Sequence, residues 1–150
     1  MNLAESTQRD LVEAADTLLA EVERWAPDDW QTACEVHGET SDAMHLVLHI
    51  ASRCRHVTAI VREQSESRLV DTDIHFQLDP TQSEAEDATA ALKQAREDAL
   101  EVVRRLNEKD IQRLHEAEID GEPDVLLASC GLIGHWRFHL QAVHQIRPDA

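Results

Sequence analysis

Histidine is frequent in this 150-residue sequence, which contains nine of them but no tyrosine and only two phenylalanines. Six of the nine fall in two segments that we expect to be helical. These six are His45, His49 and His56 in one segment, and His135, His139 and His144 in the other. Neutral imidazole is a common ligand of zinc and other divalent ions, so these two groups are the candidate chemical centre.

His135 and His139 are four residues apart, so on a helix their side chains project next to each other. With His135 at zero and 100° per residue, His139 falls near 40° and the apolar Leu132 and Val143 near 60–80°. His144 falls near 180°, on the solvent side. Burying two unpaired imidazole rings costs a few kcal/mol, so two inward-facing histidines favour a metal site.

His49 is the expected third ligand. The three histidines of its segment lie within about 40° of one another beside the apolar face, and His49 is the nearest to that face. At 1.5 Å per residue, His49 is about 12 Å from the start of its helix, and His139 is about 22 Å along a helix of about 34 Å. Antiparallel packing of the two helices would bring His49 level with His139. We therefore predict one divalent ion on His49, His135 and His139.

The role of His45 is open, because it precedes His49 by one helical turn. It would either lie at the rim of the site, which we favour, or complete a four-histidine set. A four-histidine set would close the coordination position that catalysis needs. His56 is expected to flank the polar side of its helix, and the connectors hold His37, His75 and His115.

The elements that position these histidines are predicted from apolar residues at three- and four-residue spacing. This pattern predicts helices over residues 5–25, 41–66, 83–106 and 124–146, with a short helical turn at 110–115. Ser41 is the expected N-cap of the second helix, and Pro123 suits the first turn of the fourth. A long link, residues 67–82, joins the second and third helices. We expect one all-α domain over residues 1–150, a four-helix bundle with a long helix 2–helix 3 connection.

Composition and charge exclude several classes of protein. The formal net charge is −16, which repels phosphate backbones and anionic membranes, so we expect neither nucleic acid nor membrane as a partner. The three cysteines, Cys34, Cys54 and Cys130, form no CxxC pair, and no signal peptide or membrane span is apparent. A reducing, cytoplasmic location is therefore expected.

Two other metal sites found in helical bundles lack their sequence patterns. Ferritin-like di-iron proteins use Glu-x-x-His pairs, and no glutamate here has a histidine three residues later. A hemerythrin-like site would need a His-x-x-x-Glu partner, which is also missing. A single ion is therefore preferred.

Short motifs surround the candidate histidines, among them His49-Ile50-Ala51 and residues 135–140, HWRFHL. They resemble motifs of the DinB/YfiT-like superfamily of proposed metalloenzymes, which has "HIA" in its second helix and H-aromatic-x-x-H-L in its last helix. Residues 38–41 and 121–125 look like the family's lead-ins to those two helices. The resemblance extends over nearly the whole chain.

The resemblance implies a four-helix bundle, often dimeric, with one divalent ion on His49, His135 and His139. The ion would be Zn, Ni, Fe or Mn. Characterised members use the metal to activate a low-molecular-weight thiol for transfer or isomerisation. For this chain the resemblance implies a thiol-dependent S-transferase or a hydrolase, with a thiol or another small molecule as substrate and a homodimer as the assembly.

The chemistry at such a site is not decided by the sequence. Three neutral histidines leave an open position on the ion for water or for a thiolate, and no catalytic acid or base stands out. Trp30 and Trp136 are candidates for shaping a pocket, and Cys54 is expected to serve packing. Gly131 and Gly134 point to close packing or, less favoured, to room for a ligand or a break in the helix. A metal-binding or stress-associated bundle without catalysis, and a helical interaction protein, remain alternatives.

Overall fold

The computed structural model describes residues 1–36, 38–64 and 85–148 of the chain. The described part is mostly helical with a few short strands, so the all-α expectation is confirmed for the helices but not for the connectors. The helices are α1 (Leu3–Glu23), the 3₁₀ helix η1 (Pro27–Gln31), α2 (Ala43–Gln64), α3 (Ala85–Arg104), α4 (Glu108–Glu116) and α5 (Gly134–Ile146). None of the helices in these ranges is both long enough and apolar enough to cross a membrane.

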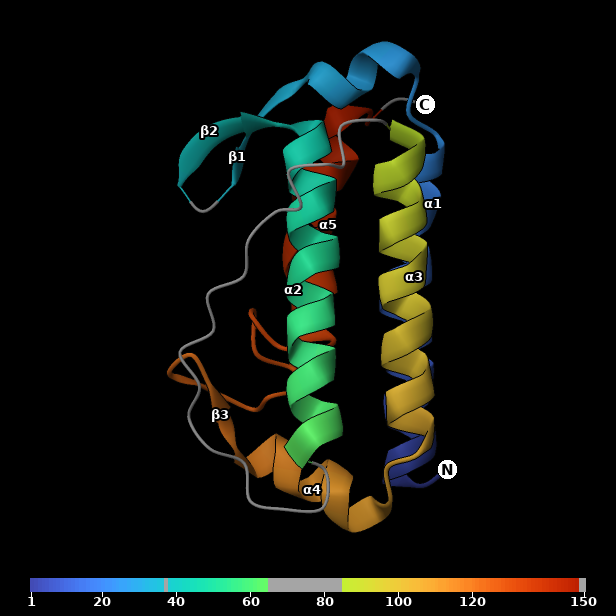
Figure 1. Ribbon diagram of the computed structural model, residues 1–150, viewed down its shortest axis with the longest axis vertical. Helices are drawn as coiled ribbons and strands as arrows, with labels where there is room; N and C mark the ends of the chain where they lie inside the picture. The colour runs from blue at the N-terminus through green and yellow to red at the C-terminus, as the bar shows by residue number, and fades with distance from the viewer. Residues whose placement is uncertain (37, 65–84, 149–150) are drawn as a thin grey trace.

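The long helices α1, α2, α3 and α5 lie along the long axis of the molecule (Figure 1). Contacts join α2 to α3, α3 to α1, α1 to α5 and α5 to α2. In Figure 1, α1 and α5 run upward while α2 and α3 run downward. Helix α2 is therefore antiparallel to α5, which is the predicted orientation, and parallel to α3. The link at 67–82 lies outside the described residues.

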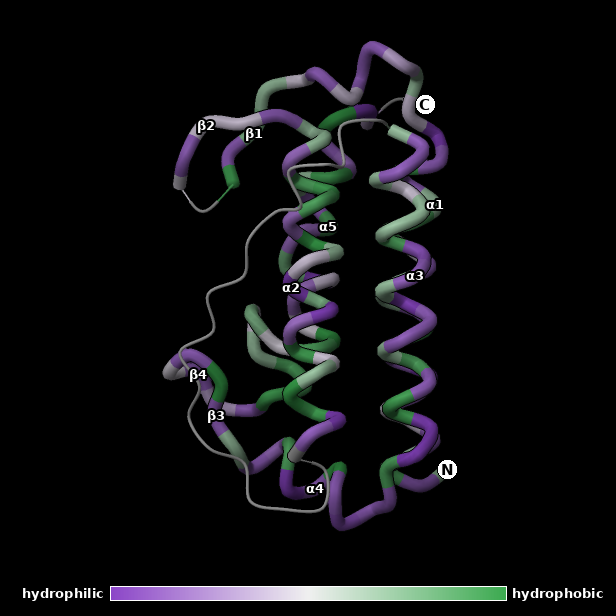
Figure 2. Tube along the Cα trace, viewed as in Figure 1, coloured by the Kyte–Doolittle hydropathy of each residue, from purple (hydrophilic) through white to green (hydrophobic). Residues whose placement is uncertain are grey.

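The core is built from the stripes of small and branched apolar residues that predicted the helices. Figure 2 shows hydrophobic segments recurring between hydrophilic ones along each long helix. Fully buried members include Leu11, Ala15 and Leu18 of α1, Leu46, Ile50 and Val57 of α2, Leu92, Ala95 and Ala99 of α3, and Trp136 and Val143 of α5. The predicted turn at 110–115 is confirmed as α4, which begins after the capping residue Asn107.

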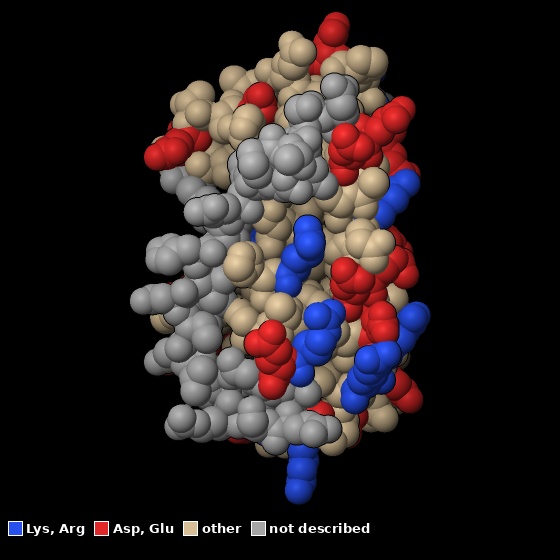
Figure 3. All heavy atoms as spheres, viewed as in Figure 1, with Lys and Arg blue, Asp and Glu red and all other residues tan. Residues whose placement is uncertain are grey.

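Most charged side chains of the described residues lie on the outside of the helices. On the face drawn in Figure 3, acidic side chains gather over α3 and basic ones lie over α2 and the lower part of α3. Arg96 of α3 pairs with Asp16 of α1 at 2.7 Å, and Lys93 pairs with Glu23 at 3.1 Å. Partly exposed pairs of this kind contribute little to stability.

A β-hairpin precedes α2 where only a connector was expected. Strand β1 (Ala33–Val36) pairs antiparallel with β2 (Glu39–Asp42), and Ala33 lies opposite Asp42. Helix α2 begins at Ala43, two residues after Ser41, so the expectation that Ser41 caps α2 is wrong. Asp42 takes that place, because its Oδ1 accepts the backbone N–H of His45 at 2.9 Å.

A second, shorter hairpin follows α4. Strand β3 (Glu118–Ile119) pairs with β4 (Glu122–Pro123), and the turn between them has positive φ at Asp120 (50°) and Gly121 (81°). Positive φ at both central residues is the conformation that Asp-Gly favours in a two-residue hairpin turn. Pro123 therefore lies in a strand, and its expected place in the first turn of a helix is wrong.

The last helix, α5, begins at Gly134, ten residues later than expected. Residues 124–133 form successive turns, in which Leu132 N–H donates to the carbonyl of Val125 at 3.0 Å. Asp124, at φ 73°, starts these turns. Val125 and Leu132 are buried all the same, at 2% and 0% exposure. Their spacing matches that of a helical apolar stripe, so the sequence predicted a helix here, but both residues reach the core from a loop.

The two glycines of this region allow the turns to pack tightly. A Cβ on Gly131 would overlap the carbonyl oxygen of Val125. A Cβ on Gly134 would overlap the carbonyl oxygens of Leu127 and Ala128. Close backbone packing is thus the reason for glycine at these two positions. The helix predicted over residues 124–146 is replaced by turns from Asp124 to residue 133.

Candidate metal centre

Three buried histidines from two helices meet with their Nε2 atoms facing one another. His49 of α2 lies 3.0 Å from His135 and 3.1 Å from His139 of α5, and the two α5 histidines are 3.0 Å apart, all measured between Nε2 atoms. The exposed fractions of the three residues are 1%, 5% and 8%. In the described part of the chain, this group of histidines is the one with metal-ligand geometry.

The packing of α2 against α5 produces this arrangement. His135 and His139 occupy consecutive turns of α5 and project from one face toward α2. The three rings stand edge-on to one another, with centroids 4.4–4.8 Å apart and interplanar angles of 66–86°. The rings therefore converge on one point through their nitrogen edges and do not stack.

The donor set fits a divalent ion better than it fits a hydrogen-bonded cluster. Each Nε2 carries either a hydrogen or a lone pair, so at least two of three mutually close Nε2 atoms are alike and repel. One ion accepts three lone pairs at once. The centre of a triangle with these sides is about 1.8 Å from each corner, so an ion at about 2.0–2.1 Å from each nitrogen fits.

The other histidines of the described residues lie apart from this centre. His45 is half exposed, and its Nδ1 lies 2.8 Å from Asp42 Oδ1, so the structure does not bring it into a four-histidine set. His115 pairs with Asp124 at 2.8 Å, and His144 pairs with Glu21 at 3.2 Å. Burial, followed by the charges of Arg53 and Arg55, lowers the pKa of His56. His37 and His75 lie outside the described residues.

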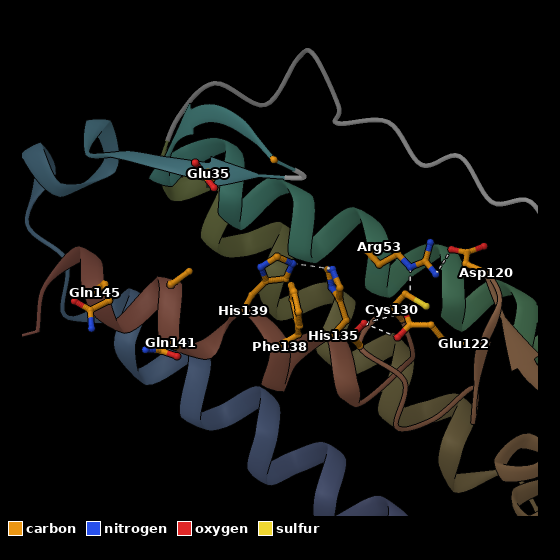
Figure 4. Close-up of a pocket in the computed structure, with 13 residues that line it drawn as sticks. Glu35, Arg53, Asp120, Glu122, Cys130, His135, Phe138, His139, Gln141 and Gln145 are labelled. Carbon is orange, nitrogen blue, oxygen red and sulfur yellow. Dashed lines mark hydrogen bonds and ion pairs between the residues drawn. The ribbon is translucent and has the colours of Figure 1, made fainter.

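A pocket of about 720 Å³ opens beside His135 and His139 (Figure 4). This volume is within the usual range for small-molecule sites, about 300–1,000 Å³. The first hairpin contributes Glu35, and the second contributes Asp120 and Glu122. The two hairpins that the sequence analysis did not expect therefore form part of the walls of the pocket.

The aromatic residue of this pocket is not one of the two expected tryptophans. Trp30 packs edge-on against Trp25, with ring centroids 4.9 Å apart, and Trp136 is fully buried in the core. Phe138 lines the pocket instead, with 63% of its surface exposed. Its ring stands at 90° to that of His139, with ring centroids 4.9 Å apart.

Arg53 is a pocket residue that was not predicted from the sequence. It follows His49 by one turn of α2 and is only 3% exposed. Its Nη2 lies 2.7 Å from Asp120 Oδ2, and its Nε donates to the carbonyl of Cys130 at 2.9 Å. Its position four residues after an inward histidine was a signal, because i and i+4 share a helix face.

Glu122, Ser129 and Cys130 form a hydrogen-bonded group at the same side of the pocket. Ser129 Oγ lies 2.9 Å and 2.8 Å from the two carboxylate oxygens of Glu122. Hydrogen bonds from Cys130 and Ser129 lower the pKa of Glu122, so it is ionised at neutral pH. Burial and the bond to Glu122 raise the pKa of Cys130 to about 12, so this thiol is protonated and a poor nucleophile.

Cys54 agrees with its expected packing role. It is buried on α2, and burial raises the pKa of its thiol to about 12. Its neighbours are the hydroxyl of Thr58 on the same helix and the backbone carbonyl of Ala95 on α3.

The chain was compared with family models, curated proteins and solved structures. No family model matches it, and neither does any curated protein or solved structure. The likeness to the DinB/YfiT-like superfamily therefore stays a prediction based on the short motifs around His49 and His135.

Proposed function

We propose that this protein is a divalent-metal-dependent enzyme of the DinB/YfiT type, built on a four-helix bundle, that acts on a small molecule. The observation that carries the proposal is the meeting of three buried Nε2 atoms within 3.0–3.1 Å, beside a pocket of about 720 Å³. A metal centre and a cavity of this size together are a common arrangement of enzymes and binding proteins for small molecules.

The roles of the residues follow from their positions. His49, His135 and His139 would hold the ion through neutral imidazoles. A divalent ion there would supply Lewis acidity, which lowers the pKa of a bound water or thiol. Glu122, ionised at the pocket wall, would add a negative charge and hydrogen-bond acceptors to the substrate site.

The nucleophile in this proposal comes with the substrate. Cys130 lines the pocket, but its pKa of about 12 leaves almost no thiolate at neutral pH. A low-molecular-weight thiol or a water molecule would then provide the attacking atom. This supports a thiol-dependent S-transferase or a hydrolase as the reaction class, in line with the family resemblance.

The first test is elemental analysis of tag-free protein, comparing the wild type with His139→Ala. The matched control is His144→Ala, because His144 lies on the same helix but at the surface beside Glu21. We expect about one equivalent of Zn, Ni, Fe or Mn in the wild type and the control. We expect its loss from His139→Ala, with circular dichroism showing that all three proteins are folded.

Two results would count against the proposal. A wild type that takes up no metal even after reconstitution would exclude a metal enzyme. One equivalent of metal with no activity toward a panel of thiol acceptors and hydrolysable esters and amides would instead favour a metal-binding protein without catalysis.

A further inference from the structure

Arg53 is a desolvated cation in a pocket whose other charged residues are acidic. Its side chain is 4% exposed, although arginine is rarely buried without a specific role. The other charged residues that line the pocket are Glu35, Asp120 and Glu122. Arg53 is thus the positively charged side chain of this pocket within the described residues.

The guanidinium of Arg53 has more N–H donors than its two protein partners accept. Arginine carries five N–H groups in a planar fork. The Nε group donates to the carbonyl of Cys130 at 2.9 Å, and Nη2 faces Asp120 Oδ2 at 2.7 Å. Across the described ranges, no hydrogen bond or ion pair of Nη1 with another protein group is found. The hydrogen bond to Cys130 and the ion pair with Asp120 fix the orientation of the guanidinium, which preorganises it for a ligand.

The position of Arg53 relative to the histidines determines which part of a bound ligand it would contact. His49 and Arg53 are four residues apart on α2, so their Cβ atoms are about 6 Å apart on one helix face. In Figure 4, Arg53, Asp120 and Cys130 lie to one side of His135 and His139, and Gln141 and Gln145 lie to the other. A molecule that contacts the histidines therefore has Arg53 within reach of one end.

We propose that Arg53 binds the carboxylate of a small-molecule ligand whose other end reaches the three-histidine centre. This inference rests on the proposed function, because it takes the same pocket as the substrate site, and it adds the chemical class of the substrate. Arginine forms its strongest hydrogen bonds with carboxylate and phosphate groups. The acidic Glu35 and Glu122 in the same lining oppose a doubly charged phosphate more than a singly charged carboxylate.

The test measures ligand binding by NMR titration of the protein as purified. The probes are butyrate, hexanoate and 3-phenylpropionate, each beside its uncharged amide. We expect the best of these carboxylates to bind the wild type at least about tenfold more tightly than its amide, as charge-assisted hydrogen bonds allow. In Arg53→Gln, this preference is expected to disappear, whereas Arg53→Lys retains part of it.

A second variant separates ligand binding from a purely structural role of Arg53. Asp120→Asn removes the carboxylate that competes for the guanidinium, so we expect carboxylate probes to bind several-fold more tightly. Asparagine tolerates the positive φ of 50° at this position, so the hairpin turn is preserved. A residue that served only to fasten the loop would give weaker binding, or none, in both variants.

Several outcomes would overturn the inference. For the wild type, these are the absence of saturable binding of any carboxylate, or equal affinity for carboxylate and amide. For the variants, these are a carboxylate preference that persists in Arg53→Gln, or carboxylate affinity that does not increase in Asp120→Asn. Tighter, Arg53-dependent binding of inorganic phosphate would overturn the choice of carboxylate. Metal analysis of the same samples distinguishes the two proposals. If the protein takes up no metal but still prefers the carboxylate over the amide in a way that depends on Arg53, only the proposed metal enzyme is contradicted.

Discussion

His49 and His135 approach to 3.0 Å between their Nε2 atoms, although 86 residues separate them in the chain. Both are buried, and one comes from the long helix α2 while the other lies in the first turn of α5. An ion held between them would tie these two helices together. Metal binding should therefore be visible as stability of the whole fold as well as occupancy of a site.

Removal of the metal is expected to lower the melting temperature. A ligand that binds only the folded state stabilises it by about 2.7 kcal/mol at a hundred times its dissociation constant. For a domain of this size, that corresponds to about 5–10 °C. Differential scanning calorimetry of the metal-loaded protein, before and after dialysis against a chelator, measures the shift.

Two variants make this measurement specific to the three-histidine centre. His49→Ala should melt at the same temperature with and without chelator, because one of the three ligands is gone. His45→Ala, one turn earlier on the same helix but half exposed, should retain the full shift. A chelator effect of equal size in wild type and His49→Ala would contradict a metal site at this position.

The sequence predicted the histidine centre because its signals are local. The i, i+4 pair His135 and His139 and the apolar stripe of α2 depend only on helical periodicity, which a single sequence displays. The helix that carries the pair is much shorter than expected, because the turns at 124–133 bury Val125 and Leu132 at helix-like intervals. Periodicity shows which residues reach the core, but not whether a loop or a helix brings them there.

The pocket could not be predicted in the same way. Its charged lining joins α2 to the hairpin after α4, and the Arg53–Asp120 contact spans segments that no local pattern connects. One signal was available, because Asp120-Gly121 is a strong indicator of a tight hairpin turn. The partner of a buried arginine, by contrast, depends on the packing of the whole molecule.

Gly134→Ala is expected to destabilise the protein by about 3 kcal/mol, although the same change inside a helix usually stabilises by about 0.5–1 kcal/mol. The reason is the overlap of the new Cβ with the carbonyl oxygens of Leu127 and Ala128, which are fixed backbone atoms. Because Gly134 adjoins His135, metal uptake should fall as well. Urea denaturation monitored by circular dichroism gives the change in free energy of unfolding.

The control for this substitution is Gly121→Asn. Gly121 has a φ of 81°, a backbone conformation that asparagine tolerates, and a Cβ at this position would have nothing within 4 Å. We expect a cost of less than about 1 kcal/mol. Equal destabilisation by both substitutions would show that close packing is not what requires glycine at position 134.

The thiol groups are expected to react in a fixed order. Burial raises the pKa of Cys54 and of Cys130 to about 12, and burial with the nearby charge of Asp42 raises that of Cys34. A raised pKa keeps the neutral thiol up to higher pH, so the labelling rates of Cys34 and Cys130 should rise about tenfold per pH unit between pH 7 and 9. Cys34 should react before Cys130, and Cys54 only after unfolding.

Glu122 is expected to control the reactivity of Cys130. In a Cys34→Ser background, Glu122→Gln removes a hydrogen bond and a negative charge that both raise the pKa of Cys130. The thiolate fraction at pH 8 increases, so iodoacetamide should label Cys130 several-fold faster, as followed by mass spectrometry of the labelled peptide. Glu118→Gln is the control, because Glu118 is an exposed glutamate of the neighbouring strand β3 that does not line the pocket. An unchanged rate in Glu122→Gln would show that Glu122 does not raise the pKa of this thiol.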